Sequence, residues 1–193
     1  MNDPGNLRLP SALTAIQRET AALGFGMASD LLTGSVLRTL VASKPAGRFL
    51  EIGTGTGAGT AWMLDGMDGD SRLWSIDIDA APQAIARKYL AADSRLTFYT
   101  EDAGAWLGKT DAAQFDLIFA DAWPGKYSHF DEALRALKTG GLYVIDDLLP
   151  QPNWPEGHEA NVTALLSILE QRTDLTLTRI CWSTGLVIAV KLN

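Results

Sequence analysis

Six acidic residues follow apolar segments of this chain at points where a buried strand would end. They are Glu51, Asp77, Asp102, Asp121, Asp146 and Asp147. In a parallel sheet the carboxyl ends of the strands meet at one rim, so these side chains should converge there. A single acid after a strand commonly caps a helix or closes a turn. Six at equivalent places indicate a ligand site, where carboxylates can bind ribose hydroxyls, a cationic group or a hard divalent ion.

A glycine-rich turn lies next to the first of these acids. The apolar run at residues 49–52 is followed by Gly53, Gly55 and Gly57. Glycine allows a positive φ and has no Cβ, so a ligand can lie against the backbone at the start of the next helix. The turn therefore predicts a nucleotide-type cofactor site. Its Gly-x-Gly-x-x-Ala spacing, which ends at Ala58, also fits the dinucleotide fingerprint and leaves an NAD(P)-dependent oxidoreductase open.

Of the two acids nearest this turn, Glu51 bears on the choice of cofactor class, whereas Asp77 indicates only a ribose. Glu51 precedes the first glycine by two residues, where a carboxylate would attract a cationic group and repel a pyrophosphate. Asp77 ends the next predicted strand, about 20 residues further on, where both cofactor classes place a ribose-binding carboxylate. The chain also lacks the Ser-Tyr-x-x-x-Lys pattern of an oxidoreductase. The oxidoreductase is therefore the weaker alternative.

The elements that would position these residues alternate between strand-like and helix-like patterns. Strands are expected at residues 48–52, 73–78, 96–100, 115–120, 142–145, 175–181 and 186–191. Helices are expected at 11–22, 29–42, 82–91, 103–107, 130–137 and 161–171, with another after the glycine turn. We predict an α/β fold: a doubly wound, Rossmann-like, mostly parallel seven-stranded sheet with a C-terminal antiparallel hairpin and helices on both faces. Residues 1–193 are expected to form one domain, with N-terminal helices in residues 1–45.

Composition limits the remaining choices. The 193 residues are 47% hydrophobic and carry a formal net charge of −7, so the clustered basic residues of a nucleic-acid-binding protein are lacking. No apolar run approaches the length of a membrane span, and no signal segment is recognised. The single cysteine, Cys181, excludes an internal disulfide and is expected in the core. We expect a cytoplasmic protein without nucleic-acid or membrane partners.

The motifs together resemble those of class I S-adenosylmethionine-dependent methyltransferases, and among them the metal-dependent O-methyltransferases of the catechol and caffeoyl-coenzyme A type. The resemblance covers most of the chain. It rests on residues 27–34, 49–59, 76–78, 101–103, 115–127 and 140–147. It implies transfer of a methyl group from S-adenosylmethionine to a hydroxyl of a small molecule. Trp123 and Trp154 in the loops favour a flat, aromatic acceptor.

The resemblance also implies which residues bind the cofactor. They are Met27, Glu51, Gly53, Gly55, Gly57, Asp77, Asp102 and Asp121. Glu51 and the glycine backbone would hold the amino-acid end, Asp77 the ribose hydroxyls and Asp102 the adenine amino group. The segment that contains Met27 would close over the sulfonium.

A divalent ion, Mg²⁺ or Ca²⁺, is implied at Asp121, Asp146 and Asp147. The usual set in the family is two aspartates and an asparagine, whereas the third residue here is an acid. Three carboxylates can still bind a hard cation. Without a metal they would repel one another, which would raise at least one pKa or turn one side chain away. Helix-capping and hydrogen-bonding acids are the alternative.

The catalytic base departs from the family pattern. A lysine is usual three residues after the first metal-binding aspartate, but Pro124 stands there and Lys126 follows two residues later. His129 and His158 are further candidates, because histidine titrates near neutrality. Lys126 and His158 are taken as the catalytic pair. The departure at Pro124 also leaves open a protein that binds S-adenosylmethionine without catalysis, and a homodimer is a further option.

Overall fold

The chain alternates strands and helices along most of its length, as the hydrophobic pattern predicts. The computed structural model describes residues 5 and 7–193. The strands are β1 Arg48–Ile52, β2 Arg72–Asp77, β3 Leu96–Thr100, β4 Phe115–Ala120, β5 Leu137–Ile145, β6 Leu175–Ile180 and β7 Leu186–Lys191. The helices are α1 Leu13–Leu23, α2 Leu31–Ala42, α3 Ala58–Gly66, α4 Ala80–Leu90, α5 Ala103–Lys109, α6 Phe130–Ala136 and α7 His158–Gln171.

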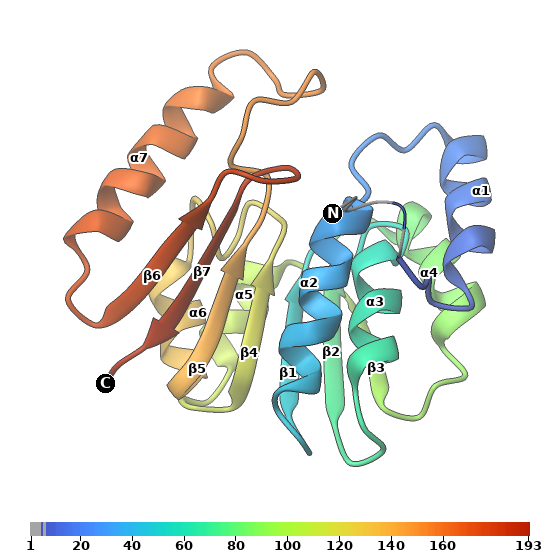
Figure 1. Ribbon diagram of the computed structural model, residues 1–193, viewed down its shortest axis with the longest axis horizontal. Helices are drawn as coiled ribbons and strands as arrows, with labels where there is room; N and C mark the ends of the chain where they lie inside the picture. The colour runs from blue at the N-terminus through green and yellow to red at the C-terminus, as the bar shows by residue number, and fades with distance from the viewer. Residues whose placement is uncertain (1–4, 6) are drawn as a thin grey trace.

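The seven strands form one sheet in the order β3-β2-β1-β4-β5-β7-β6 (Figure 1). Strands β1 to β5 pair in parallel, and β7 is antiparallel to both of its neighbours, β5 and β6. The prediction of a mostly parallel, doubly wound sheet with a closing hairpin is confirmed. The strand order reverses between β1 and β4, which is where such folds bind ligands beyond the carboxyl ends of the strands. In Figure 1 strands β4 and β5 point upward, so this edge lies at the top.

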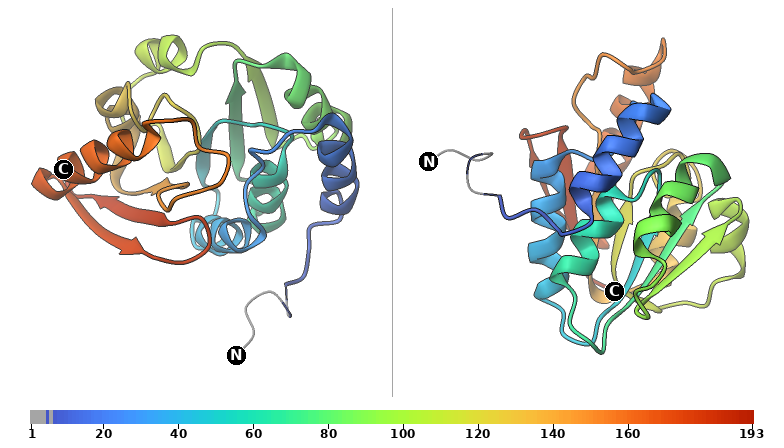
Figure 2. Two further views of the ribbon diagram at one scale, coloured as in Figure 1. Left: turned by 90° about the horizontal axis from the view of Figure 1, so that it is seen from above. Right: turned by 90° about the vertical axis from the view of Figure 1, so that its right-hand side faces the viewer.

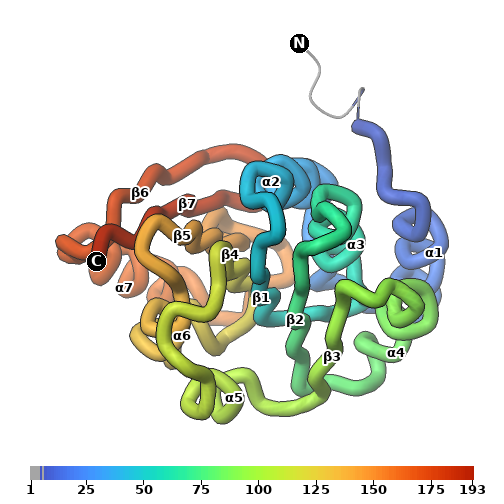
Figure 3. Tube along the Cα trace, turned by 90° about the horizontal axis from the view of Figure 1, so that it is seen from below, coloured from blue at the N-terminus to red at the C-terminus, as the bar shows by residue number. Residues whose placement is uncertain are grey.

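Alternate residues of the strands pack into two separate hydrophobic cores, one on each face of the sheet. Phe49 and Leu117 pack with α1 to α4, whereas Leu50 and Ile118 pack with α5 to α7. This alternation follows from the two-residue period of a strand. Figure 3 shows α2 and α3 on one side of the strands and α5 and α6 on the other. Both faces are covered, so the central strands are apolar on both faces.

Helix α2 lies very close to α3. A Cβ on Gly34 would come within 2.1 Å of the Trp62 ring, which is fully buried, so only glycine fits in α2 at this point. Asp30 caps the helix, because its Oδ1 accepts a hydrogen bond of 2.8 Å from the Leu32 amide. The amino end of α2 is therefore fixed beside the carboxyl edge of the sheet.

The structure differs most from the sequence-based expectation in three places, and several other element ends differ by one or two residues. Strand β5 begins at Leu137 instead of residue 142, because the expected glycine stop after α6 lies inside the strand, where the pairing with β4 shifts register. Helix α7 begins at His158 instead of residue 161. The expected burial of Cys181 is wrong, since this residue follows β6 at the edge of the sheet and is exposed.

None of the helices in the described part of the chain has the length and apolar character needed to cross a bilayer.

Candidate active site

Three cavities lie side by side along the carboxyl edge of the sheet. The wide cavity has a volume of about 580 Å³, the middle cavity about 380 Å³ and the narrow cavity about 310 Å³. Met27 and Asp121 line both the wide and the middle cavity. Gly53 and Asp77 line both the middle and the narrow cavity. The three therefore form one trough that crosses the switch point.

Two segments that are far apart in the sequence cover the wide end of the trough. Residues 26–30, before α2, and residues 151–155, after β5, both line the wide cavity. Figure 2 (left) looks down on this edge and shows the blue and orange loops that contain them. They are joined directly, because Asn153 Nδ2 donates a hydrogen bond of 2.9 Å to Gly26 O.

The glycine turn between β1 and α3 forms the floor of the middle cavity. Gly53 has φ of 102°, and a Cβ there would lie 2.8 Å from the backbone oxygen of Asp121. Gly55 has φ of 51° and donates its amide to Asp77 Oδ2 at 2.7 Å. Asp77 Oδ1 accepts from the Asp79 amide at 2.9 Å. Asp77 thus braces the turn, and a carboxylate still has lone pairs left for a ligand.

Gly57 and Glu51, both predicted to bind the cofactor, do not line any of the three cavities. A Cβ on Gly57 would lie 2.7 Å from Ala86 Cβ, so this glycine lets α3 and α4 approach. Glu51 is buried under the turn and accepts hydrogen bonds from Thr60 and Ser75. Burial, opposed by these two hydroxyls, raises the pKa of Glu51 from 4.5 to about 8. Both residues therefore support the glycine turn from the side that faces away from the cavities.

A buried polar network under the turn was missed by the sequence reasoning. Ser75 Oγ bonds Thr54 Oγ1 at 2.7 Å, and Gln83 Nε2 donates to Thr54 Oγ1 at 3.1 Å and to Tyr99 O at 2.8 Å. Gln83 is fully buried. Polar residues inside an apolar strand and on the inner face of α4 were the available signal, because buried polar groups need partners.

The narrow cavity contains Asp102 and His129. Asp102 caps α5, because its Oδ1 accepts from the Ala105 amide at 2.7 Å, and its second oxygen accepts no hydrogen bond within the described residues. His129 Nδ1 lies 3.2 Å from Ser128 Oγ. His129 is at the opposite end of the trough from His158, which lines the wide cavity. The structure therefore separates the two histidines considered as bases.

The three predicted metal ligands lie at the wide cavity, but each is held by other groups. Asp121 Oδ2 accepts from Ser29 Oγ at 3.0 Å. Asp146 Oδ1 accepts from Thr184 Oγ1 and from the Asp147 amide, and Thr33 Oγ1 lies 3.4 Å away. Asp147 has φ of 62°, and its Oδ2 accepts from Trp154 Nε1 at 2.9 Å. Each of the three carboxylates thus has one oxygen engaged by a donor of the protein.

Lys126 lines the same cavity. Its side chain is only 5% exposed, and Nζ donates to the backbone oxygen of Asp146 at 2.8 Å. Burial raises the pKa of Asp121 and of Asp146, while the Lys126 charge opposes the rise at both. The loop of Pro124 and Gly125 turns the lysine inward, and Gly125 takes a φ of 85°. Lys126 therefore lines the wide cavity beside the three acids, and its catalytic role stays a prediction.

Trp123, Trp154 and His158 form the outer wall of the wide cavity, and Tyr127 packs against this wall without lining the cavity. Tyr127 Oη lies 3.0 Å from His158 Nε2, and the Trp154 and His158 ring centres are 4.6 Å apart. Trp123 packs on Tyr127 with 4.9 Å between ring centres. Burial and the charges of Asp147 and Asp121 raise the pKa of Tyr127 to about 12, so its hydroxyl stays protonated near neutral pH. This wall offers flat apolar contact beside a histidine.

The expected Mg²⁺ or Ca²⁺ does not fit this arrangement. Across the described residues there is no group of three or more His, Cys, Asp or Glu side chains placed to hold a metal ion. The carboxylates of Asp121, Asp146 and Asp147 are turned toward hydroxyl, amide and indole donors. An ammonium is buried beside them. A divalent ion would have to gather the remaining oxygens of carboxylates that are held toward separate donors, and it would approach a like charge.

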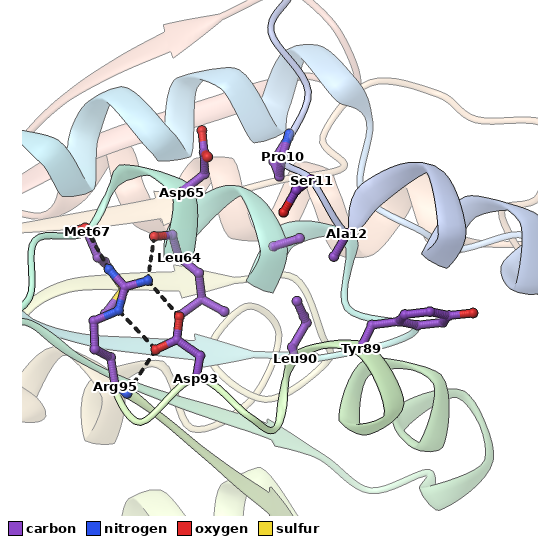
Figure 4. A pocket seen from close by; sticks show the side chains of 11 residues that line it. Pro10, Ser11, Ala12, Leu64, Asp65, Met67, Tyr89, Leu90, Asp93 and Arg95 are labelled. Carbon is purple, nitrogen blue, oxygen red and sulfur yellow. Dashed lines mark hydrogen bonds and ion pairs between the residues drawn. The ribbon is translucent and has the colours of Figure 1, made fainter.

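Another cavity, of about 420 Å³, lies on the far side of α3 (Figure 4). Its one guanidinium, Arg95, is satisfied within the protein: it bonds Asp93 and donates to Leu64 O at 3.1 Å and Met67 O at 2.7 Å. None of the predicted site residues lines it. We assign it a structural role, in which Arg95 holds the end of α3.

A model of the family described as "O-methyltransferase" matches residues 8–180. The chain belongs to this O-methyltransferase family. Among its curated relatives, the "Putative O-methyltransferase" of Mycolicibacterium vanbaalenii is 32% identical over 140 residues, 69% of this chain and 62% of the relative. The relative of that name in Mycolicibacterium smegmatis is 28% identical over 191 residues, 93% of this chain and 90% of the relative.

Two solved O-methyltransferases share the fold. TomG of Streptomyces achromogenes, in complex with S-adenosylmethionine, has a TM-score of 0.85 at 24% identity and covers 99% of this chain and 94% of its own. The enzyme of Bacillus cereus, in complex with S-adenosylhomocysteine, has a TM-score of 0.84 at 19% identity and covers 98% and 94%. The alignment with the M. vanbaalenii relative spans about 62% of that protein's length.

Proposed function

We propose that this chain binds S-adenosylmethionine along the trough and transfers its methyl group to a hydroxyl of a small, flat molecule in the wide cavity. Membership of the O-methyltransferase family supports the reaction class. The continuity of the three cavities supports one cofactor and one acceptor in contact, because Met27 and Asp121 lie where the middle and wide cavities join.

The charge of the middle cavity is the observation that carries the proposal. Asp77, Asp79 and Asp121 line it, and its described lining residues include neither lysine nor arginine. A pyrophosphate would be repelled there, whereas a sulfonium and an amino group would be attracted. This charge pattern favours S-adenosylmethionine over NAD(P), the alternative that the glycine spacing left open.

The residues of the trough fit the parts of this cofactor. The bare backbone at Gly53 and Gly55 leaves room for the amino-acid end, Asp77 would accept from the ribose hydroxyls, and Asp102 would accept from the adenine amino group. Met27 would lie over the sulfonium, where its exposed side chain excludes water. Glu51 and Gly57, which do not line the cavities, would keep the glycine turn in place.

When bound, S-adenosylmethionine supplies a methyl group on a sulfur that leaves as a neutral thioether. The protein's main task is then to align the acceptor oxygen with this carbon and to exclude water. The new C–O bond takes its electron pair from the acceptor oxygen, the S–C pair stays on sulfur, and the hydroxyl proton must leave. His158 is the group that we propose accepts this proton, directly or through the Tyr127 hydroxyl bonded to it.

The first experiment is a calorimetric titration with S-adenosylhomocysteine. NAD⁺ is titrated in parallel as the ligand of the alternative, oxidoreductase class. We expect binding of the homocysteine compound alone. Asp77→Ala should weaken it by about tenfold or more, or about 1.4 kcal/mol, because a charge-assisted hydrogen-bond pair is lost. Asp70→Ala, an exposed acid in the loop before β2, is the matched control and should bind normally.

The outcomes separate the alternatives. Binding of NAD⁺ in place of S-adenosylhomocysteine would move the protein to the oxidoreductase class. Unchanged affinity in Asp77→Ala would remove Asp77 from the ribose site. Normal binding without methylation of any phenol or alcohol in an acceptor panel, followed by mass spectrometry of the products, would favour a binding protein without catalysis.

A further inference from the structure

We infer that the Lys126 ammonium supplies the positive charge that a divalent ion supplies in the metal-dependent O-methyltransferases that the sequence resembles, so that the wide cavity works without a metal. This inference rests on the proposed function for its catalytic meaning. The claim about metal binding can be tested without any methyl acceptor.

The first support is the position of Lys126. Lysines are almost never buried unless they are paired, and this one is 5% exposed on a loop that brings it under the cavity. Asp121, Asp146 and Asp147 line the same cavity, so the ammonium faces the set of acids expected to hold the metal. Its charge offsets part of their mutual repulsion.

The second support is the state of the carboxylates. Asp146 is 2% exposed and receives Thr184 and the Asp147 amide, so its Oδ1 is turned into the protein. Asp147, in a left-handed backbone conformation, points to the Trp154 indole. A hard cation needs several oxygens that converge on one point, whereas these acids are bound to separate donors.

The third support is the donor capacity of the ammonium. Lysine Nζ has three N–H groups and no acceptor. Within the described residues a hydrogen bond to Asp146 O uses one of them. The others are available to an acceptor oxygen in the cavity. There the ammonium can stabilise negative charge as it develops on that oxygen, which is what a metal does as a Lewis acid.

The test is Mn²⁺ binding followed by electron paramagnetic resonance, on the full chain with and without S-adenosylhomocysteine. Mn²⁺ suits oxygen-rich sites and reports binding directly. For the wild type we expect no site tighter than about 1 mM. A stoichiometric Mn²⁺ site of higher affinity in the wild type would overturn the inference.

Variants of the lysine sharpen the test. Lys126→Gln removes the charge and should bind Mn²⁺ at least about tenfold more tightly than the wild type, while Lys126→Arg should remain without a site. Lys109→Gln, an exposed lysine at the end of α5, is the matched control and should behave as the wild type. If Lys126→Gln folds and gains no affinity, the ammonium is not what excludes the ion and the inference is wrong.

The wild-type measurement decides the matter even if Lys126→Gln fails to fold. It is also independent of the proposed function, because S-adenosylhomocysteine binding is read separately by calorimetry. Failure to bind that compound would remove the methyltransferase proposal and leave the Mn²⁺ result standing.

Discussion

The two ends of the trough are built in different ways. The end proposed for the cofactor is held by backbone: a glycine turn at a strand–helix junction, braced by Asp77 and by a buried network that includes Gln83. The wide cavity is held by side chains from distant segments, such as Ser29 on Asp121 and Thr184 on Asp146. A backbone scaffold leaves its pattern in the local sequence, whereas a side-chain scaffold depends on tertiary contacts. The predictions below test this difference.

The largest expected effect is a pH dependence at the cofactor end. The folded-state pKa of Glu51, about 8, lies above its ordinary value of 4.5. Its contribution to stability is therefore complete below the ordinary value and is lost as the pH rises through the folded value. Relative to Glu51→Gln, the wild type should lose on the order of a few kcal/mol of unfolding free energy between about pH 5 and about pH 9.

Urea unfolding across that range measures this effect. Glu156→Gln, an exposed acid in the loop before α7, is the control and should follow the wild type. Parallel curves for the wild type and Glu51→Gln would mean that Glu51 is ionised in the folded protein, and the turn would then rest on a charged group.

The next effect is at the turn itself. Gly53→Ala should lower the unfolding free energy by about 2 kcal/mol, because alanine resists the positive φ and its Cβ would press on the Asp121 backbone. Gly69→Ala is matched to it, since a Cβ at Gly69 would meet nothing within 4 Å. Chemical denaturation compares the two. Equal unfolding free energies for Gly53→Ala and Gly69→Ala would show that the turn tolerates a side chain at residue 53 and is not a rigid backbone scaffold.

The smallest effect is at the wide cavity. Trp154→Phe removes the indole donor to Asp147 and should cost about 1 kcal/mol of unfolding free energy. Affinity for S-adenosylhomocysteine should stay unchanged, because Trp154 lines the wide cavity and not the middle one. Calorimetry of the variant measures this. A marked loss of that affinity would mean that the two ends of the trough are coupled.

Sequence reasoning succeeded where the signal was local. The alternating pattern gave the bounds of β1, β3, β4 and β7 as the structure has them, and the spacing of Gly53, Gly55 and Asp77 located the middle cavity. It could not show that Glu51 is buried under the glycine turn and does not line the middle cavity, because burial depends on the tertiary packing around the strand. The alternation of apolar and polar residues predicts a strand equally well at the edge or in the centre of the sheet. For this reason Cys181 was expected in the core, although it is exposed.

At the wide cavity the sequence brought the acids together but not their partners. Thr33 and Thr184 are 151 residues apart and meet only after α2 and the β6–β7 turn have packed. Lys126 could be assigned to a loop, but the inward direction of that loop follows from the positive φ of Gly125. The metal expectation came from residue types alone, and those types do not specify which donors occupy their oxygens.

The close contact between Gly34 and Trp62 limits how this protein can evolve. Any larger residue at 34 would collide with the indole, so a smaller residue at 62 must come first. The intermediate would carry a void in the core between α2 and α3, which is destabilising in itself. Because α2 also carries Thr33, whose hydroxyl lies 3.4 Å from Asp146, that path would shift the wide cavity. Neutral drift in this pair should therefore be rare, and paired changes in descendants of this chain should coincide with changes in the acceptor.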